Sequence, residues 1–131
     1  MKNAYKVSEL SETYGETFDM VGMSDTEDIL NINLIGYSGL SITLSFDSYL
    51  LYRKVFEGDV LKIIGDLKRD EVLGCWLVEV FDSELITWLE EQSYGARRSS
   101  VLKHYCVVSA NSLVDIVCLE PPKIRTDALA V

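Results

Sequence analysis

The chain has 131 residues, of which 48% are hydrophobic and 25% charged, and it carries a formal net charge of −9. This composition is typical of one globular domain and excludes a disordered chain. So much negative charge argues against nucleic acid or an anionic membrane as a partner, and it favours a basic protein surface.

The negative charge is concentrated in the first part of the chain. Residues 1–95 contain 7 Lys and Arg against 18 Asp and Glu, whereas residues 96–131 contain 5 against 3. No segment approaches the roughly 18 consecutive apolar residues that span a bilayer. The start of the chain, MKNAYKVSEL, lacks the apolar run of a secretory signal. We therefore expect a cytoplasmic protein with a single domain over residues 1–131.

The three cysteines, Cys75, Cys106 and Cys118, each lie in an apolar stretch, and no two have CxxC spacing. We expect them to act as small buried hydrophobic residues. Three reduced thiols fit a reducing compartment, and their spacing predicts neither a disulfide framework nor a metal site.

The first 28 residues form a polar, acidic segment. Tyr5, Leu10 and Tyr14 recur at near-helical spacing, which predicts a short helix around residues 5–14. Gly15 and Gly22 indicate that the remainder of this segment is loop.

The clearest local pattern is a hairpin over residues 30–46. Apolar residues alternate with Asn over 30–34 and with Ser and Thr over 40–46, and Gly-Tyr-Ser-Gly separates the two runs. Alternation with period two on both sides of a glycine-bounded turn predicts two antiparallel strands, apolar on one face. Tyr37 lies at the tip, where we expect its ring to be exposed.

A third strand is predicted over residues 49–56, which are rich in aromatic and β-branched residues. The period then becomes ambiguous: residues 60–67 fit a helix capped by Asp59, with a strand over residues 60–64 as the alternative. Residues 74–81 contain a single charge and predict a central strand with both faces covered.

A second helix is predicted next, capped by Asp82 or Ser83. Leu85, Trp88 and Leu89 form its core stripe, and Gly95 is well placed to end it. Two apolar runs, 104–108 and 113–119, predict a second hairpin. After Pro121-Pro122, residues 123–131 form a tail whose docking the sequence leaves open.

These elements together predict the α+β class. We expect an antiparallel or mixed β-sheet, built from two hairpins and further strands, with one to three helices packed on one face.

No motif in the chain predicts catalysis, a cofactor or a bound metal. There is no phosphate-binding glycine loop and no G-x-S-x-G sequence. His104 is the single histidine, and a strand histidine flanked by Lys103 and Tyr105 is typical of a structural hydrogen-bonding residue. An enzyme or ligand pocket remains an alternative if His104, Tyr105 and Glu79 converge.

The candidate binding residues are acidic side chains in two clusters, together with one exposed aromatic ring. Either cluster can be a solvated surface or the contact surface for a basic partner, whose association such charge accelerates. The candidates are Asp25, Glu27 and Asp28 before the first hairpin, Asp82, Glu84, Glu90 and Glu91 around the second helix, and Tyr37.

In general character, as a small acidic α+β domain without catalytic motifs, the chain resembles bacterial immunity proteins, which neutralise nuclease or other toxins delivered between competing cells. The stretch Ser83–Leu89, SELITWL, followed by His104-Tyr105, adds to this resemblance. The resemblance implies a non-catalytic protein that binds one basic toxin domain tightly, through acidic side chains and exposed aromatic rings.

Two other functions remain open. The first is a self-associating structural or regulatory domain, in which the apolar strands over residues 74–81 or 113–119 pair between two copies. The expected state is therefore a monomer, or a homodimer if these strands pair. Alternatively, the chain is a small ligand-binding domain or enzyme with a pocket near His104.

Overall fold

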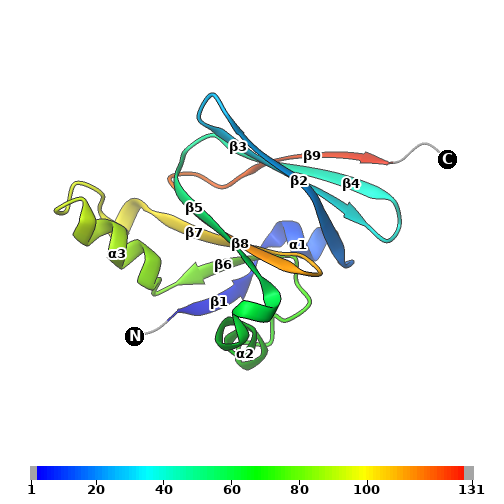
Figure 1. Ribbon diagram of the computed structural model, residues 1–131, viewed down its shortest axis with the longest axis horizontal. Helices are drawn as coiled ribbons and strands as arrows, with labels where there is room; N and C mark the ends of the chain where they lie inside the picture. The colour runs from blue at the N-terminus through cyan, green and yellow to red at the C-terminus, as the bar shows by residue number, and fades with distance from the viewer. Residues whose placement is uncertain (1–2, 129–131) are drawn as a thin grey trace.

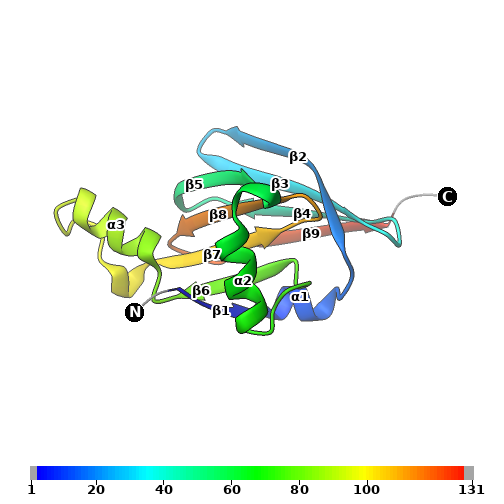
Figure 2. The ribbon, with the colours of Figure 1, turned by 60° about the horizontal axis from the view of Figure 1, so that its bottom comes forward.

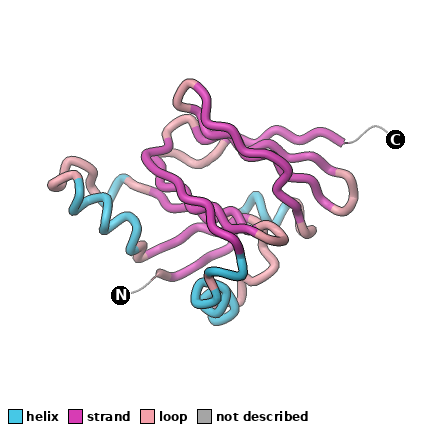
Figure 3. Tube along the Cα trace, viewed as in Figure 1, coloured by secondary structure: helices cyan, strands magenta, loops and turns pink. Residues whose placement is uncertain are grey.

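The computed structural model describes residues 3–128, and in this part of the chain nine strands form two antiparallel sheets (Figure 1, Figure 3). The strands are β1 (Ala4–Val7), β2 (Phe18–Thr26), β3 (Ile29–Gly36), β4 (Leu40–Phe46), β5 (Tyr49–Phe56), β6 (Leu77–Phe81), β7 (Lys103–Val108), β8 (Ser112–Cys118) and β9 (Lys123–Ala128). The helices are α1 (Glu9–Thr13), α2 (Leu61–Arg69) and α3 (Glu84–Gln92), with short 3-10 turns at Glu57–Asp59 and Ser99–Val101.

The strand order is β1-β6-β7-β8-β5 in the five-stranded sheet and β2-β3-β4-β9 in the four-stranded sheet. The two sheets share one large hydrophobic core. Within it, the ring of Phe46 from the four-stranded sheet lies 6.3 Å, centroid to centroid, from the ring of Tyr105 in the five-stranded sheet. The α+β class predicted from the sequence is confirmed, with the strands divided between two packed sheets.

The predicted first hairpin is present as β3 and β4, paired from Leu30–Phe46 to Ile35–Ser41. Its alternating apolar residues are fully buried in the core except Leu40, which is half-buried, and the intervening Asn, Ser and Thr residues are half-buried on the opposite face. Two cross-strand hydrogen bonds, Thr43 to Asn33 and Ser45 to Asn31, order this polar face.

The five-stranded sheet is covered on both of its faces. One face contacts the four-stranded sheet, and α2 and α3 pack on the other, which we call the outer face (Figure 2). Burial on both faces explains why β8 has no exposed residue and why its sequence is apolar apart from Ser112 and Asp115. The two apolar strands considered for pairing between copies, β6 and β8, both lie inside this sheet.

The N-terminal segment is where the sequence-based prediction was wrong. A helix was expected around residues 5–14, but residues 4–7 form the edge strand β1, and the helix begins only after Ser8, which caps α1. The expected loop contains the nine-residue strand β2, whose regular alternation is broken by a bulge between Met20 and Gly22. Such a bulge removes the period-two pattern by which strands are recognised.

Further along the chain, most predicted elements are present. The helical alternative was correct for residues 61–69, although Val60 and not Asp59 precedes α2, without a capping side chain. Ser83 caps α3 as predicted. The tail docks: β9 pairs with β4 from Lys123–Ser45 to Ala128–Leu40, while residues 129–131 lie outside the described part of the chain.

Within residues 3–128, no helix has the length and apolar character that crossing a membrane requires.

The shared core predicts a large stability loss when one of its fully buried side chains is shortened. Leu44→Ala is expected to lower the free energy of unfolding by about 2–5 kcal/mol, because it removes buried methyl groups and leaves a cavity. The matched control is Leu61→Ala, whose side chain is exposed on α2 and which should change stability by less than about 0.5 kcal/mol. Urea unfolding of the three proteins measures both values, and equal losses would contradict this placement of the core.

Candidate functional site

A carboxylate lies in the middle of the most buried strand of the protein. Asp115 of β8 is 4% exposed and points to the outer face of the five-stranded sheet. One of its oxygens, Oδ1, lies 2.7 Å from Nε2 of His104 on β7, and the other, Oδ2, accepts from Nε of Arg53 on β5 at 2.9 Å. Three adjacent strands are thereby joined through one side chain.

The imidazole extends this chain of hydrogen bonds to the start of α3. Nδ1 of His104 lies 2.7 Å from Oγ of Ser83, and the same oxygen accepts from the backbone N–H of Ile86 at 3.1 Å. When the ring is neutral with its proton on Nε2, the Ser83 hydroxyl donates to Nδ1 and still caps the helix. We call these four side chains, Ser83, His104, Asp115 and Arg53, the buried polar chain.

The buried polar chain contains the residue types of a catalytic triad, but its contacts fit a structural role. His104 is 1% exposed and Ser83 is 6% exposed, and the Ser83 oxygen is already engaged by the helix that it caps. Triads instead present their nucleophile to substrate. The expectation that His104 is a structural hydrogen-bonding residue agrees with these contacts.

Arg53 reaches Asp115 because of an irregularity in β5. Tyr49 pairs with Cys118, but the next pair is Leu51 with Val117, so Leu50 is an extra residue. Continued without this bulge, the register would place Tyr52 opposite Asp115. The bulge instead puts Arg53 there and turns its side chain to the outer face.

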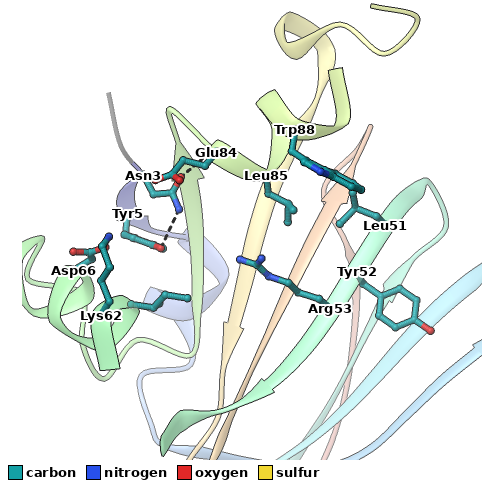
Figure 4. Close-up of a pocket in the computed structure, with 11 residues that line it drawn as sticks. Asn3, Tyr5, Leu51, Tyr52, Arg53, Lys62, Asp66, Glu84, Leu85 and Trp88 are labelled. Carbon is teal, nitrogen blue, oxygen red and sulfur yellow. Dashed lines mark hydrogen bonds and ion pairs between the residues drawn. The ribbon is translucent and has the colours of Figure 1, made fainter. Parts of the chain in front are cut away.

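Above Arg53 lies a groove of about 710 Å³ between α2 and α3 (Figure 4). Its floor is the outer face of the five-stranded sheet, where Tyr5 of β1 and Arg53 of β5 approach from opposite edges. Figure 4 shows the guanidinium of Arg53 pointing into the centre of the groove. The volume falls within the range of sites that hold small ligands.

The two walls of the groove differ in character. On the α2 side, Asp66 forms two ion pairs, with Nζ of Lys62 and with a terminal nitrogen of Arg69, each at 3.4 Å. On the α3 side, Leu85 and Trp88 form an apolar wall, and Glu84 stands at its end beside Asn3 (Figure 4).

The first acidic cluster lies at the turn between β2 and β3. Asp25 accepts hydrogen bonds from the hydroxyls of Tyr49, at 2.7 Å, and Tyr52, at 3.1 Å, and its carboxylate is therefore partly engaged. The hydrogen bond from Tyr49 to Asp25, together with burial, raises the pKa of Tyr49 to about 12. Glu27 and Asp28 form the exposed turn itself, both with positive φ.

The second acidic cluster lies on and beside α3. Glu84 and Glu91 are exposed on the helix, and Asp82 is exposed just before it, with φ 53°. Glu90 is half-buried and accepts a hydrogen bond from the backbone of Ser99 at 2.8 Å, which fixes the loop after the helix.

Tyr37 is 79% exposed, as expected, but it lies far from both clusters at the turn between β3 and β4. This turn stands at the opposite end of β3 from Glu27 and Asp28, about 25 Å away at the usual rise per strand residue. The structure therefore does not bring Tyr37 together with the acidic residues.

Two residues of the groove have a different role from the one their sequence pattern suggested. Trp88 was expected in the core stripe of α3, but it is 51% exposed, and Ile86 is the buried residue of that helix. Arg53 was predicted only as part of a strand, because no local pattern marks a strand arginine as the partner of a carboxylate 62 residues away.

The side chains of His104, Tyr105 and Glu79 do not converge on one pocket. Glu79 and Tyr105 are paired on neighbouring strands and line one hollow, but Tyr105 faces the four-stranded sheet, whereas His104 faces the start of α3. Successive residues of a strand point to opposite faces, so His104 and Tyr105 cannot share one pocket.

Among the described residues, no three His, Cys, Asp or Glu side chains come together in a way that could hold a metal ion. No family model matches the chain, and no similar protein was found among curated proteins or solved structures.

The contacts of Asp115 predict how stability depends on pH. Burial alone raises the pKa of Asp115, but hydrogen bonds and charge from His104 and Arg53 outweigh it and hold the pKa below its ordinary value. A carboxyl with a lowered folded pKa stabilises the fold above its unfolded pKa of about 3.9, and this contribution disappears as the pH falls through the folded pKa.

Asp115→Asn should therefore lower the free energy of unfolding by about 3 kcal/mol at pH 7, because a buried charged partner of His104 and Arg53 is lost. The difference from the unsubstituted protein should shrink below about pH 4, measured by urea unfolding at several pH values. Asp127→Asn, in an exposed ion pair, serves as the control and should have little effect at any pH. A difference that stays constant down to pH 3 would contradict this account.

Proposed function

We propose that this chain is a non-catalytic binding protein of the immunity type, which neutralises a basic toxin domain by binding it. The observation that carries the proposal is an exposed tryptophan between two free carboxylates on α3. Glu84, Trp88 and Glu91, which we call the α3 face, stand at positions i, i+4 and i+7 and are all exposed.

The spacing places these three side chains on one side of the helix. Tryptophan is enriched among the residues that carry most of the binding energy of an interface. The α3 face therefore has an apolar centre with charged positions on either side.

Its charge selects a cationic partner. Neither Glu84 nor Glu91 forms an ion pair with any described residue, and residues 82–92 contain no Lys or Arg. Uncompensated carboxylates attract a basic surface and raise its association rate, an effect that salt screens. The overall charge of −9 acts in the same direction.

The cluster at the turn between β2 and β3 fits this role less well. Asp25 is held by two tyrosine hydroxyls, and no exposed aromatic ring accompanies Glu27 and Asp28 in the turn. We therefore place the main contact on the α3 face.

The test is the retention of one partner by variants of the two clusters. The protein is immobilised, and lysate of source cells is applied at low salt and eluted by a salt gradient. Trp88→Ala should weaken a stoichiometric basic partner by about 2 kcal/mol, or about 30-fold. Glu84→Gln with Glu91→Gln should weaken it further and reduce the salt dependence.

The matched controls are Tyr37→Ala, which removes an exposed aromatic ring elsewhere, and Glu27→Gln with Asp28→Asn, which removes two charges from the turn. Both should retain the partner within about twofold. Expression of the captured partner alone should arrest growth, and co-expression with this chain should restore it. A partner that Trp88→Ala retains fully, or whose expression is harmless, would refute the proposal.

A further inference from the structure

We propose that the groove between α2 and α3 is a binding site for a monovalent carboxylate whose apolar body lies against Leu85 and Trp88. The carboxylate is received by Arg53 and by the hydroxyl of Tyr5. The groove shares Glu84 and Trp88 with the α3 face, but the groups proposed to receive the carboxylate, Arg53 and Tyr5, belong to the groove alone.

Arg53 has unused hydrogen-bond donors that face the groove. Its Nε is used by Asp115, while its two terminal nitrogens form no hydrogen bond with any described residue. The side chain is 50% exposed and points into the groove (Figure 4). Asp115 is itself fixed by His104, so the buried polar chain holds the guanidinium in one orientation with its donors free. Paired N–H donors of this kind match the two oxygens of a carboxylate.

A second hydrogen-bond donor lies on the same floor of the groove. The hydroxyl of Tyr5 accepts a hydrogen bond from Nδ2 of Asn3 at 3.4 Å, which leaves its own hydrogen available. Burial raises the pKa of Tyr5 to about 12, so this hydroxyl remains a donor at neutral pH. Figure 4 shows it directed from the β1 side toward the centre of the groove. Arg53 and Tyr5 therefore present donors to the same groove from the two edges of the sheet.

The charge of the groove decides which anion fits. Asp115 compensates Arg53, Asp66 is paired with both Lys62 and Arg69, and Glu84 has no cationic partner among the described residues. Arg53 and Lys62 of the groove are thus already paired with carboxylates, and a doubly charged phosphate would be repelled by the unpaired Glu84. A single carboxylate gains the same directed hydrogen bonds with less repulsion.

The apolar wall defines the rest of the ligand. Leu51 of β5 and Leu85 and Trp88 of α3 line the groove on the same side of Arg53 (Figure 4). A tryptophan face and two leucines favour an aromatic ring or a short alkyl chain. Such a carboxylate is either a free small acid or the C-terminal residue of a polypeptide.

The experiment measures chemical shift changes of the backbone amides during titration with four probes. 3-Phenylpropionate and the peptide Gly-Gly-Phe carry a phenyl ring and a free carboxylate, and their amides lack the charge. Each acid should bind about tenfold more tightly than its amide, with shifts confined to the elements that line the groove, β1, β5, α2 and α3. Tighter binding of the small acid identifies a free ligand, and tighter binding of the peptide identifies a chain terminus.

Three variants distinguish the proposed contacts from a general effect of charge. Arg53→Lys keeps the positive charge for Asp115 but loses the paired donors, and Tyr5→Phe removes only the hydroxyl; each should weaken the acids by about fivefold or more. Lys54→Met, on the next residue of β5 and outside the groove, should leave binding unchanged.

The proposal is overturned if acids and amides bind equally, if inorganic phosphate binds more tightly than the acids, or if Tyr5→Phe binds the acids normally. Because no protein partner is present, none of these results depends on the toxin-binding proposal.

Discussion

The structure depends on how one buried charge is accommodated. Asp115 lies in a strand whose seven residues are all buried, and a carboxylate there is costly unless hydrogen bonds and positive charge surround it. Its partners come from both neighbouring strands, and through His104 they reach the hydroxyl that starts α3. The contacts of Asp115 therefore link the strand order β7-β8-β5, the first turn of α3 and the orientation of Arg53. The groove lies where the last of these residues, Arg53, reaches solvent.

Much of the fold could be predicted from local sequence patterns, and the exceptions have physical reasons. The first hairpin was predictable because one face of β3 and β4 is buried and the other is wet, which produces strict alternation. By contrast, β2 contains a bulge, and β9 is an edge strand with Lys123 and Arg125 on its outer side, so neither gives a clear period. The division of strands between two sheets is a matter of long-range packing, which no single segment records.

The candidate site was less predictable than the fold. Glu84 and Glu91 were identifiable from their charge, and Ser83 from its position before a helix. Trp88 was wrongly assigned to the core, because apolar residues at helical spacing do not show how much of a helix surface is covered, and α3 packs along a narrow strip. Arg53 could not have been found without knowing that Leu50 is an extra residue in the pairing of β5 with β8. One bulge thus decides which side chain faces the groove.

The strand order also has a consequence for behaviour in concentrated solution. Open sheets have unpaired edges, and edge-to-edge pairing of such strands is a common route to aggregation. Here the four edge strands are β1, β5, β2 and β9, and each has an exposed charged residue: Lys6, Lys54, Asp19 and Lys123. A second chain that approaches any of these edges must desolvate that charge, which favours solubility of the folded protein even though nearly half of its sequence is hydrophobic.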